Sequence, residues 1–432
     1  MRAMKDSGIE WIGEIPEGWK IIRTKIVFSH HKTIVGKKSS EYQRLALTLM
    51  GVIPRSKDDS TGLQPEEFNN YQVLEAGNLV FKLIDLENVS TSRVGFSPFT
   101  GIVSPAYIIL TPTTNTGVKF YYYHFYSMWQ REIFNHMGDD GVRSALNSKD
   151  LLNIPLPCPP PAEQQRIAAY LDEQCVEIDK VLAKTRESIE EYKKLKQSVI
   201  TEAVTKGIRP DRPMKPSGIE WIGDIPAEWK TTKTKFCTSK IGSGKTPKGG
   251  AENYTDSGIM ILRSQNIHNG NLILDNVCHI SAEVDEDMVN TRVFADDVLL
   301  NITGGSIGRC CIYPSNLSHA NVNQHVCIIR TIPKILLPRL MLYIWMSEIG
   351  QKSIEVFQTG ANREGMNFEQ IGNTVIPIMV GQEQLEIVSY LDRQCAEIDR
   401  LIAKKEQIIS ELEGYKKSLI YECVTGKREV AG

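Results

Sequence analysis

The chain has 432 residues, which is enough for two or three domains with buried cores. Lys and Arg number 50 and Asp and Glu number 52, so the net charge of −2 does not by itself indicate a nucleic-acid-binding protein. Nine scattered cysteines without a CxxC pair favour a reducing compartment with free thiols. There is neither a signal peptide nor a long apolar run, so no membrane role is indicated and we expect a cytoplasmic protein.

A tryptophan-containing segment opens each half of the chain. Residues 7–20, SGIEWIGEIPEGWK, return at residues 217–230 as SGIEWIGDIPAEWK, an offset of 210. Glycine and proline interrupt the apolar residues of both copies, which is typical of a loop. We interpret these leading segments as aromatic anchors that pack on the region that follows them. The alternative is a repeated ligand site.

Two regions that differ in sequence follow the leading segments. Residues 21–157 and 231–377 both contain short β-like runs broken by Gly, Pro, Asn and Asp. Each region also predicts one helix, at Phe120–Asn135 and at Leu340–Met346. The predicted strands are Leu45–Leu49, Tyr71–Leu74, Asn78–Leu83 and Tyr107–Leu110 in the first region, and Ile259–Leu262, Leu272–Leu274, Val298–Ile302 and Val326–Arg330 in the second.

A long helical stretch closes each half. Residues 163–205 match residues 383–425 at an offset of 220. Apolar residues recur in both copies with alternating steps of four and three, which is the pattern of a coiled-coil seam. Roughly 43 helical residues at about 1.5 Å each give a rod of about 65 Å. The alternative is two unrelated amphipathic helices in larger cores. The predicted seam residues are Leu171, Ile178, Leu182, Ile189, Tyr192, Val199, Leu391, Ile398, Ile402, Ile409, Leu412 and Leu419.

The whole chain is therefore a tandem duplication of leading segment, variable region and long helix. The repeat is too long for a solenoid and describes a pseudo-dimer fused into one chain. Because closely matching helices carry divergent regions, we interpret the chain as a duplicated frame that holds two heads with different preferences.

Motifs that would indicate an enzyme are incomplete. The run Gly242–Thr246 resembles a phosphate-binding P-loop, but Ser239 stands where that motif needs glycine and Pro247 would stop the following helix. The glycine-rich run Thr303–Gly308 is weak evidence for a cofactor loop, and a tight turn between strands is the other interpretation. The histidines lack metal-ligand spacing, and we recognise no methyltransferase, nuclease or serine–histidine–aspartate motif. The sequence gives no positive indication of catalysis.

Basic residues cluster at the start of both variable regions. A charge run usually forms a solvated face, but repetition at the same place in both halves favours phosphate binding. The clusters are Lys20, Arg23, Lys25, Lys32, Lys37, Lys38 and Arg44 in the first half, and Lys230, Lys233, Lys235, Lys240, Lys245 and Lys248 in the second.

A paired Arg and Asn occur near the end of each variable region. Arg143 aligns with Arg363, and Asn147 aligns with Asn367. Arg and Asn are the side chains that pair with the edges of guanine and adenine. They are also ordinary loop and helix-capping residues, so both interpretations stay open.

This combination of features resembles the specificity subunit of Type I restriction–modification systems. The resemblance rests on the duplicated leading segment, on the two variable regions, and on long helices that open with Glu163-Gln164-Gln165 and Glu383-Gln384. It covers essentially the whole chain. The second opening, Val380-Gly381-Gln382, lacks the prolines that precede the first.

The resemblance implies an α+β fold in which two globular mixed α/β target recognition domains are joined by two long antiparallel coiled-coil helices, as a pseudo-two-fold tandem repeat. Each recognition domain would bind one half of an asymmetric bipartite double-stranded DNA sequence. The paired helices would hold the heads about 34 Å apart, which is one turn of duplex. The implied parts are recognition domain 1 at residues 1–158, spacer helix 1 at 159–207, recognition domain 2 at 208–378 and spacer helix 2 at 379–427.

The resemblance also implies that the chain itself is not catalytic and holds no cofactor or metal. Two modification subunits would methylate adenine with S-adenosylmethionine, and restriction subunits would act as a motor and nuclease with ATP and Mg. Two other hypotheses remain, a protein-only scaffold whose heads bind peptides or partner proteins and an enzyme with an unfamiliar site in the second head. The candidate DNA-binding residues are Lys32, Lys37, Lys38, Arg143, Ser144, Asn147, Lys240, Lys245, Thr246, Lys248, Arg263, Gln324, His325, Arg363 and Asn367.

Overall fold

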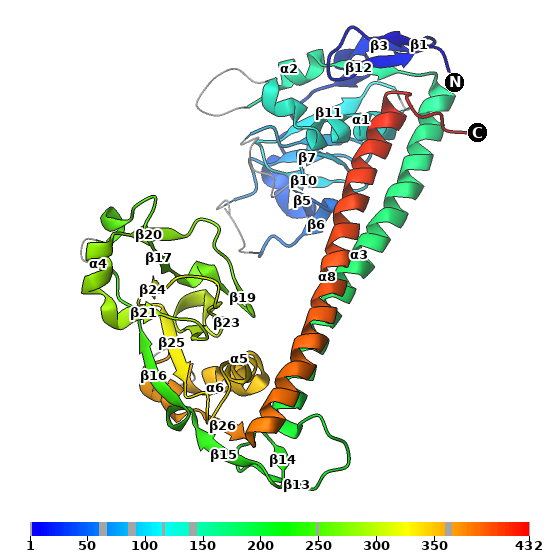
Figure 1. Ribbon diagram of the computed structural model, residues 1–432. Helices are drawn as coiled ribbons and strands as arrows, with labels where there is room; N and C mark the ends of the chain where they lie inside the picture. The colour runs from blue at the N-terminus through cyan, green and yellow to red at the C-terminus, as the bar shows by residue number, and fades with distance from the viewer. Residues whose placement is uncertain are drawn as a thin grey trace. The chain divides into compact units, whose positions relative to one another are not determined.

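The computed structural model divides the chain into two compact units (Figure 1). Unit 1 comprises Met1–Arg186 and Glu406–Gly432, and unit 2 comprises Glu187–Lys405. The structure describes residues 2–59, 67–84, 92–114, 117–137, 145–247, 250–358 and 365–431. Two long helices, α3 (Pro161–Lys206) and α8 (Gly381–Val424), each contribute one part to each unit.

Unit 1 contains a head built from two four-stranded sheets. One sheet has the strand order β6-β5-β10-β7, and the other has the order β4-β11-β8-β9. The strands of the first sheet are β5 (Arg44–Thr48), β6 (Gly51–Arg55), β7 (Gln72–Leu74) and β10 (Gly101–Val103), and those of the second are β4 (Phe28–Ser29), β8 (Leu79–Phe81), β9 (Val94–Phe96) and β11 (Ile108–Pro112). The hairpin β1 (Met4–Asp6) and β2 (Glu14–Pro16), the pair β3 (Lys20–Arg23) and β12 (Pro155–Cys158), and helices α1 (Val118–Gln130) and α2 (Ser148–Asn153) complete it.

Unit 2 contains a second head with the same plan. Its sheets have the strand orders β20-β17-β24-β21 and β16-β25-β22-β23. The first consists of β17 (Ile259–Leu262), β20 (Cys278–Ile280), β21 (Arg292–Val293) and β24 (Ala320–Val322), and the second of β16 (Thr238–Ser243), β22 (Val298–Asn301), β23 (Cys310–Ile312) and β25 (Val326–Thr331). The remaining elements are β13 (Met214–Pro216), β14 (Asp224–Pro226), β15 (Lys230–Lys233), β18 (Ile267–His268), β19 (Asn271–Leu272), β26 (Val375–Ile378), α4 (Ala282–Asp287), α5 (Pro338–Met346), α6 (Glu348–Gln358) and α7 (Phe368–Asn373).

The two heads share one topology although their sequences diverge. In each head the first sheet contains a parallel central pair, β5–β10 in unit 1 and β17–β24 in unit 2. The other sheet is antiparallel in both, and its strands follow one another in the same spatial order. Among the described residues, the hairpin β18–β19 and the helices α4 and α6 are found in the second head without a counterpart in the first. The expected duplicated mixed α/β fold is therefore confirmed.

Most predicted elements match the observed ones, and the misses have local causes. The predicted helix Phe120–Asn135 ends at Gln130, because Glu132 adopts a left-handed backbone conformation with φ of 58°. The predicted strand Leu272–Leu274 is reduced to the two-residue β19. In contrast, β17 and β25 lie where strands were expected.

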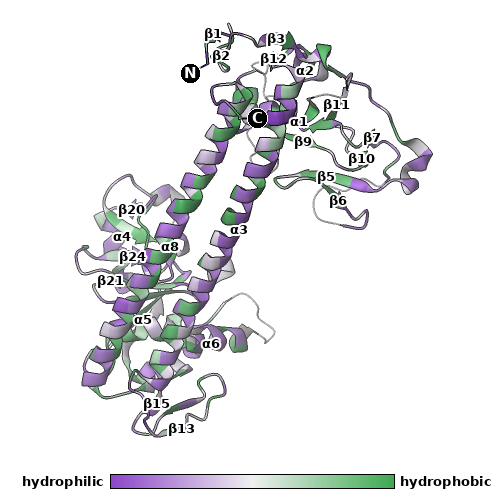
Figure 2. Ribbon diagram, turned by 90° about the vertical axis from the view of Figure 1, so that its right-hand side faces the viewer, coloured by the Kyte–Doolittle hydropathy of each residue, from purple (hydrophilic) through white to green (hydrophobic). Residues whose placement is uncertain are grey.

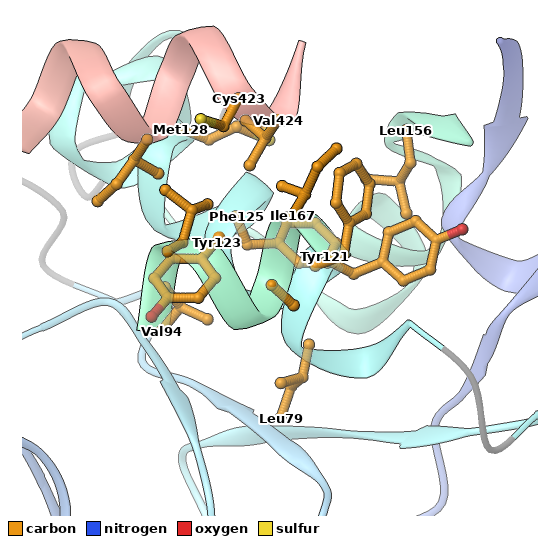
Figure 3. Packing of buried hydrophobic residues seen from close by; sticks show 14 of the residues in the cluster. Leu79, Val94, Tyr121, Tyr123, Phe125, Met128, Leu156, Ile167, Cys423 and Val424 are labelled. Carbon is orange, nitrogen blue, oxygen red and sulfur yellow. The ribbon is translucent and has the colours of Figure 1, made fainter. Parts of the chain in front are cut away.

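The core of unit 1 lies between its head and the long helices. Figure 3 shows Tyr121 and Phe125 of α1 beside Ile167 of α3 and Val424 of α8, all of which are buried. Phe125 also meets Phe81 of β8 edge to face, with ring centroids 5.1 Å apart. Helix α1 is thus packed between the sheet that contains β8 and the long helices α3 and α8. Unit 2 has the equivalent core around α5, α8 and the end of α3.

Within each unit, the segments of α3 and α8 run antiparallel. In unit 1, Asp179 accepts from Lys416 at 2.7 Å, whereas Arg186, further along α3, meets the earlier residue Glu413 at 2.6 Å. In unit 2, Lys196 donates to Asp399 at 2.7 Å. All twelve predicted seam residues are buried or half-buried, and hydrophobic and hydrophilic residues alternate along both helices in Figure 2.

None of the helices in the described ranges combines the length and the apolar character needed to cross a membrane.

Candidate nucleic-acid interface

Each head is fastened to a long helix by its leading segment. Trp19 is fully buried and donates its indole N–H to Glu163 Oε2 at 3.0 Å. Trp229 makes the same bond to Glu383 Oε2 at 2.9 Å. In both units an arginine guanidinium lies over the indole and pairs with the same carboxylate, Arg2 in unit 1 and Arg212 in unit 2. The repeated tryptophans are therefore structural anchors of the heads.

The glutamine after each of these glutamates fixes the chain that enters the helix. Gln164 Nε2 donates to the carbonyl of Pro159 at 2.8 Å, and Gln384 Nε2 donates to that of Met379 at 3.0 Å. The second opening lacks the prolines of the first, yet it forms the equivalent bond. This contact depends on a backbone carbonyl, which any residue at the position supplies.

The same hydrogen-bond geometry joins the head helix, α1 in unit 1 and α5 in unit 2, to a long helix. Tyr123 of α1 donates to Asp172 Oδ1 at 2.8 Å, and Tyr343 of α5 donates to Asp392 Oδ1 at 2.5 Å. Burial is the main cause that raises the pKa of both phenols, so both remain protonated donors. Each carboxylate also pairs with a cation on the head helix. Each head is thus attached to its long helix by the same set of contacts.

In the second head, loops from four strands meet at one edge of the sheets. The turn after β24 approaches the end of β17, because Asn323 N–H donates to the carbonyl of Leu262 at 3.1 Å. The same turn approaches β22, because Ile302 N–H donates to the carbonyl of His325 at 3.0 Å. The loop after β16 lies so close that a Cβ at Gly244 would be 1.5 Å from the carbonyl oxygen of Val322. Glycine is therefore required there.

This edge carries a chain of polar side chains. Thr246 Oγ1 donates to Gln324 Oε1, and Gln324 Nε2 lies 3.3 Å from His325 Nε2. His325 Nδ1 lies 2.6 Å from Thr303 Oγ1. Three of these residues were sequence candidates, and the structure brings them together. Thr303 was missed, because the run that it opens looks like a turn and only the strand register places it beside His325.

Two basic residues adjoin the segments that meet at this edge, because Lys245 precedes Thr246 and Arg263 follows Leu262, whose carbonyl accepts from Asn323. Lys245 Nζ donates to the carbonyl of Asp287 at 2.5 Å. Arg263 lies over the ring of Tyr254, 5.8 Å from its centroid, and its buried Nε has no hydrogen-bond partner among the described residues. A neutral carbonyl or ring leaves the net charge of each cation in place, so both can attract phosphate. Asp287, whose carbonyl accepts from Lys245, is the last residue of the acidic helix α4.

Lys240 is a weaker candidate for a phosphate contact. Its ammonium donates to the carbonyl of Asn290 at 2.6 Å. Burial, and next the neighbouring Arg330, lower the pKa of this ammonium. Arg330 is itself held by the buried carboxylate of Asp297 at 2.7 Å. The surroundings of Lys240 therefore fit a role in joining β16 to the segment before β21.

The equivalent edge of the first head has a different chemistry. Leu146 N–H donates to the carbonyl of Leu83 at 3.0 Å, as Met366 N–H does to that of Ile302 at 2.9 Å. The strand pairings align β8 with β22 and β11 with β25. This register places Ile84, Pro105 and Ala106 where the second head has Thr303, Gln324 and His325.

A depression of about 250 Å³ lies at this edge of the first head. Lys32 and His30 flank it, with Lys32 Nζ donating to the carbonyl of Pro105 at 2.9 Å and His30 Nδ1 lying 2.8 Å from the carbonyl oxygen of Ile109. Sequence reasoning selected Lys32 but missed the apolar lining, which carries no motif. The lining residues are His30, Lys32, Leu83, Ile84, Pro105, Ala106, Tyr107, Ile108, Leu146, Asn147 and Ser148.

The remaining candidates fall into three groups. Lys37 and Lys38 lie exposed on a 3-10 helix at Gly36–Glu41. Asn147 and Asn367 are the N-caps of α2 and α7, each with a capping box. Asn147 Oδ1 accepts from two backbone N–H groups, so a bidentate contact to adenine would require it to give up a capping bond, whereas Asn367 Oδ1 accepts from one and keeps a second lone pair. Four candidates lie outside the described residues: Arg143, Ser144, Lys248 and Arg363.

Among the described residues, no group of three or more His, Cys, Asp or Glu side chains is arranged to hold a metal ion. The polar chain of the second head also contains no carboxylate or thiol. Its side chains are neutral donors and acceptors, which suits recognition of a polar surface by hydrogen bonds.

Comparison with known proteins identifies relatives along the whole chain. A family model described as the Type I restriction modification DNA specificity domain matches residues 16–191 and 226–413. The specificity subunit of the Escherichia coli type I restriction enzyme EcoBI is 26% identical over 297 residues, which are 65% of this chain and only 60% of that protein. The EcoKI specificity subunit of the same species is 22% identical, with 96% of this chain and 90% of that protein aligned.

An archaeal relative and a solved structure extend the comparison. The putative MjaX specificity subunit of Methanocaldococcus jannaschii is 24% identical, with 97% of this chain and 96% of that protein aligned. A solved chain from a study of complex assembly and conformational transition in the type I R-M system has 14% sequence identity and a TM-score of 0.70, over 96% of this chain and 99% of that chain. This structural likeness concerns the fold.

Proposed function

The chain belongs to the Type I restriction modification DNA specificity family, and we propose that it reads a bipartite, asymmetric double-stranded DNA sequence, one half with each head. It is a sequence-recognition subunit of a Type I restriction–modification system. The family model covers both halves of the duplication, and each matched range contains one head and most of one long helix.

One observation supports two different half-sites. Both heads have the same sheet topology, yet equivalent positions at one edge carry Ile84, Pro105 and Ala106 in the first head and Thr303, Gln324 and His325 in the second. A common scaffold with different exposed or half-buried side chains at one edge is the arrangement expected of two readers of different sequences. Lys32 in the first head, and Lys245 and Arg263 in the second, would contact phosphates and position these edges on the duplex.

We propose that partner subunits, and not this chain, catalyse the reactions on DNA. Two modification subunits would methylate adenine with S-adenosylmethionine, and restriction subunits would use ATP and Mg. The absence of a recognised catalytic motif in the sequence supports a non-catalytic role for this chain. Base flipping would then also fall to the partners, because methylation requires the target base outside the stack. A scaffold that binds only proteins is not favoured, because the family is defined by DNA specificity.

Selection from random duplexes tests this proposal. The full chain, assembled with modification subunits, is incubated with a random duplex library, and the retained DNA is sequenced. We expect two specified half-sites separated by unspecified base pairs. Retention without sequence enrichment, or a single contiguous motif, would contradict two-headed reading.

A further inference from the structure

Gln324 of the second head has an exposed side-chain amide that is held in place by hydrogen bonds at both of its ends. The residue lies in the turn between β24 and β25. Thr246 reaches one end of the amide from the loop after β16, and His325 reaches the other end. His325 is held in turn by Thr303 at the end of β22, at 2.6 Å. Three separate segments therefore fix the plane of a single surface side chain.

The turn itself does not depend on this amide. His325 N–H donates to Asn323 Oδ1 at 3.1 Å, and Asn323 N–H is bonded to the carbonyl of Leu262 at 3.1 Å. The carbonyl of His325 accepts from Ile302 at 3.0 Å. The first head forms the equivalent turn with Pro105, which has no amide side chain. The orientation of Gln324 is thus additional to what the fold requires.

Counting hydrogen bonds shows what the amide still offers. A glutamine side chain has two N–H donors and two acceptor lone pairs. Thr246 occupies one group and His325 occupies another. If the amide is turned over and the imidazole tautomer changes with it, the same two partners remain satisfied. In both arrangements one N–H and one lone pair have no partner among the described residues.

One free donor beside one free acceptor matches adenine. In the major groove, adenine presents the N7 acceptor next to the N6 donor, and a glutamine amide can bond to both. Guanine presents two acceptors, so the free lone pair of the amide would face O6. We propose that Gln324 reads one adenine of the half-site bound by the second head, an inference that rests on the proposed function.

The neighbouring residues have a different role from Gln324. Thr246, His325 and Thr303 are positioning residues, because they orient the amide without being needed at the base. Lys245 precedes Thr246 and Arg263 follows Leu262 at the end of β17, and phosphate contacts from these two cations would set the register of the edge on the duplex. The contact to N7 and N6 belongs to Gln324 alone.

Atomic substitution in the DNA tests this assignment. Each adenine of the selected second half-site is replaced in turn by 7-deazaadenine, which lacks N7, and the affinity of the assembled complex is measured at fixed salt. With the wild-type chain, we expect one position at which affinity falls about tenfold. With Gln324→Ala, affinity for the natural site falls by a similar factor, and 7-deazaadenine at that position causes no further loss.

A second variant gives a readout that a structural role would not change. Gln324→Glu retains the shape but offers only acceptors, so we expect the preferred base at that position to shift from adenine to cytosine, whose N4 is a donor. Pro105→Ala is the matched control at the equivalent turn of the first head, and it should leave the second half-site unchanged.

The outcomes separate this inference from the proposed function. If the wild-type complex prefers no sequence, the proposed function fails. If it prefers a bipartite site but Gln324→Ala shows the same 7-deazaadenine profile as wild type, only the assignment of Gln324 is overturned. A second half-site without any required A·T pair would also overturn it.

Discussion

At the scale of single residues, His124 of the head helix α1 is a buried histidine without a polar partner in the part of the chain that the structure describes. Its side chain is 2% exposed, and neither ring nitrogen has a hydrogen-bond partner among the described residues. Burial, and next Arg131, lower its pKa from the ordinary 6.5 to about 3. The residue at the matching place in α5 is Ile344, which is also buried.

We predict that His124 makes the protein sensitive to mild acid. Between pH 6.5 and 3 the His124 imidazole is protonated in the unfolded chain but stays neutral in the folded protein. The free energy of unfolding therefore falls as the pH decreases. The loss between pH 7 and pH 5 should be about 2 kcal/mol. Melting curves of His124→Ile should show a smaller drop in Tm over this range than wild type. The exposed His136→Gln serves as the control, and an unchanged drop in His124→Ile would contradict this account.

Lys245 should act on DNA binding without regard to sequence. Its ammonium is bonded to a neutral carbonyl, so its full charge is available to a phosphate. We predict that Lys245→Ala weakens binding to specific and random duplexes alike and reduces the slope of log K against log salt by about 1. Lys215 also donates to a carbonyl, that of Ala227 at 2.7 Å, and Lys215→Ala should leave the slope unchanged. An unaltered slope in Lys245→Ala would remove this residue from the interface.

The sequence predicted some of these residues better than others. Trp19 and Trp229 were recognisable as anchors because their surroundings repeat. The hydrogen-bonded side chains that link Thr246 to Thr303 through Gln324 and His325 were only partly recognisable. They lie on separate segments of the sequence, and only the strand register brings these segments together. The capping roles of Asn147 and Asn367 could not be separated from base recognition, since both use the same side-chain atoms.

At the scale of elements, the sequence predicted the long helices and several strands of the heads, but it did not predict how those strands pair. A seam repeated over many turns indicates a coiled coil without tertiary information. The strands of the heads are mostly two to six residues long, so their pairing is decided by contacts distant in sequence. The shared topology is therefore seen in the strand pairing, where the parallel pair β5–β10 of the first head corresponds to the parallel pair β17–β24 of the second.

The antiparallel pairing of the helices can be tested within unit 1. Lys416 donates to both carboxylate oxygens of Asp179 at 2.7 Å, with side chains 18% and 57% exposed. We predict that Lys416→Asp lowers stability by about 1 kcal/mol, the modest effect expected of a partly exposed pair. The double change Asp179→Lys with Lys416→Asp should recover most of the loss, as measured by chemical denaturation. Lys180 and Glu177 form a pair within one helix, and exchanging them is the control.

A double exchange that is no more stable than Lys416→Asp alone would contradict the antiparallel register. Parallel helices would not bring these two positions together. The measurement therefore examines the pairing itself and not merely the helical content of α3 and α8.

At the scale of the whole molecule, the duplication gives the two heads equivalent contacts at their bases. Thr24 closes the base of the first head through its N–H and hydroxyl, which donate to the carbonyl of Ile154 at 3.0 and 2.9 Å. Thr234 closes the second in the same way on Thr374, at 2.9 and 3.0 Å. The anchors that join each head to its helices are also equivalent. These matching boundaries define residues 24–154 and 234–374 as units of exchange.

A chain with two copies of the second head tests the central claim most directly. Residues 24–154 are replaced by a copy of residues 234–374, and the assembled complex is used to select its preferred sequence from random duplexes. Because the repeats are carried on antiparallel helices, we predict an inverted repeat of the second half-site. Retention of the original first half-site, or two half-sites repeated in the same direction, would contradict a chain in which each head reads one half of the target.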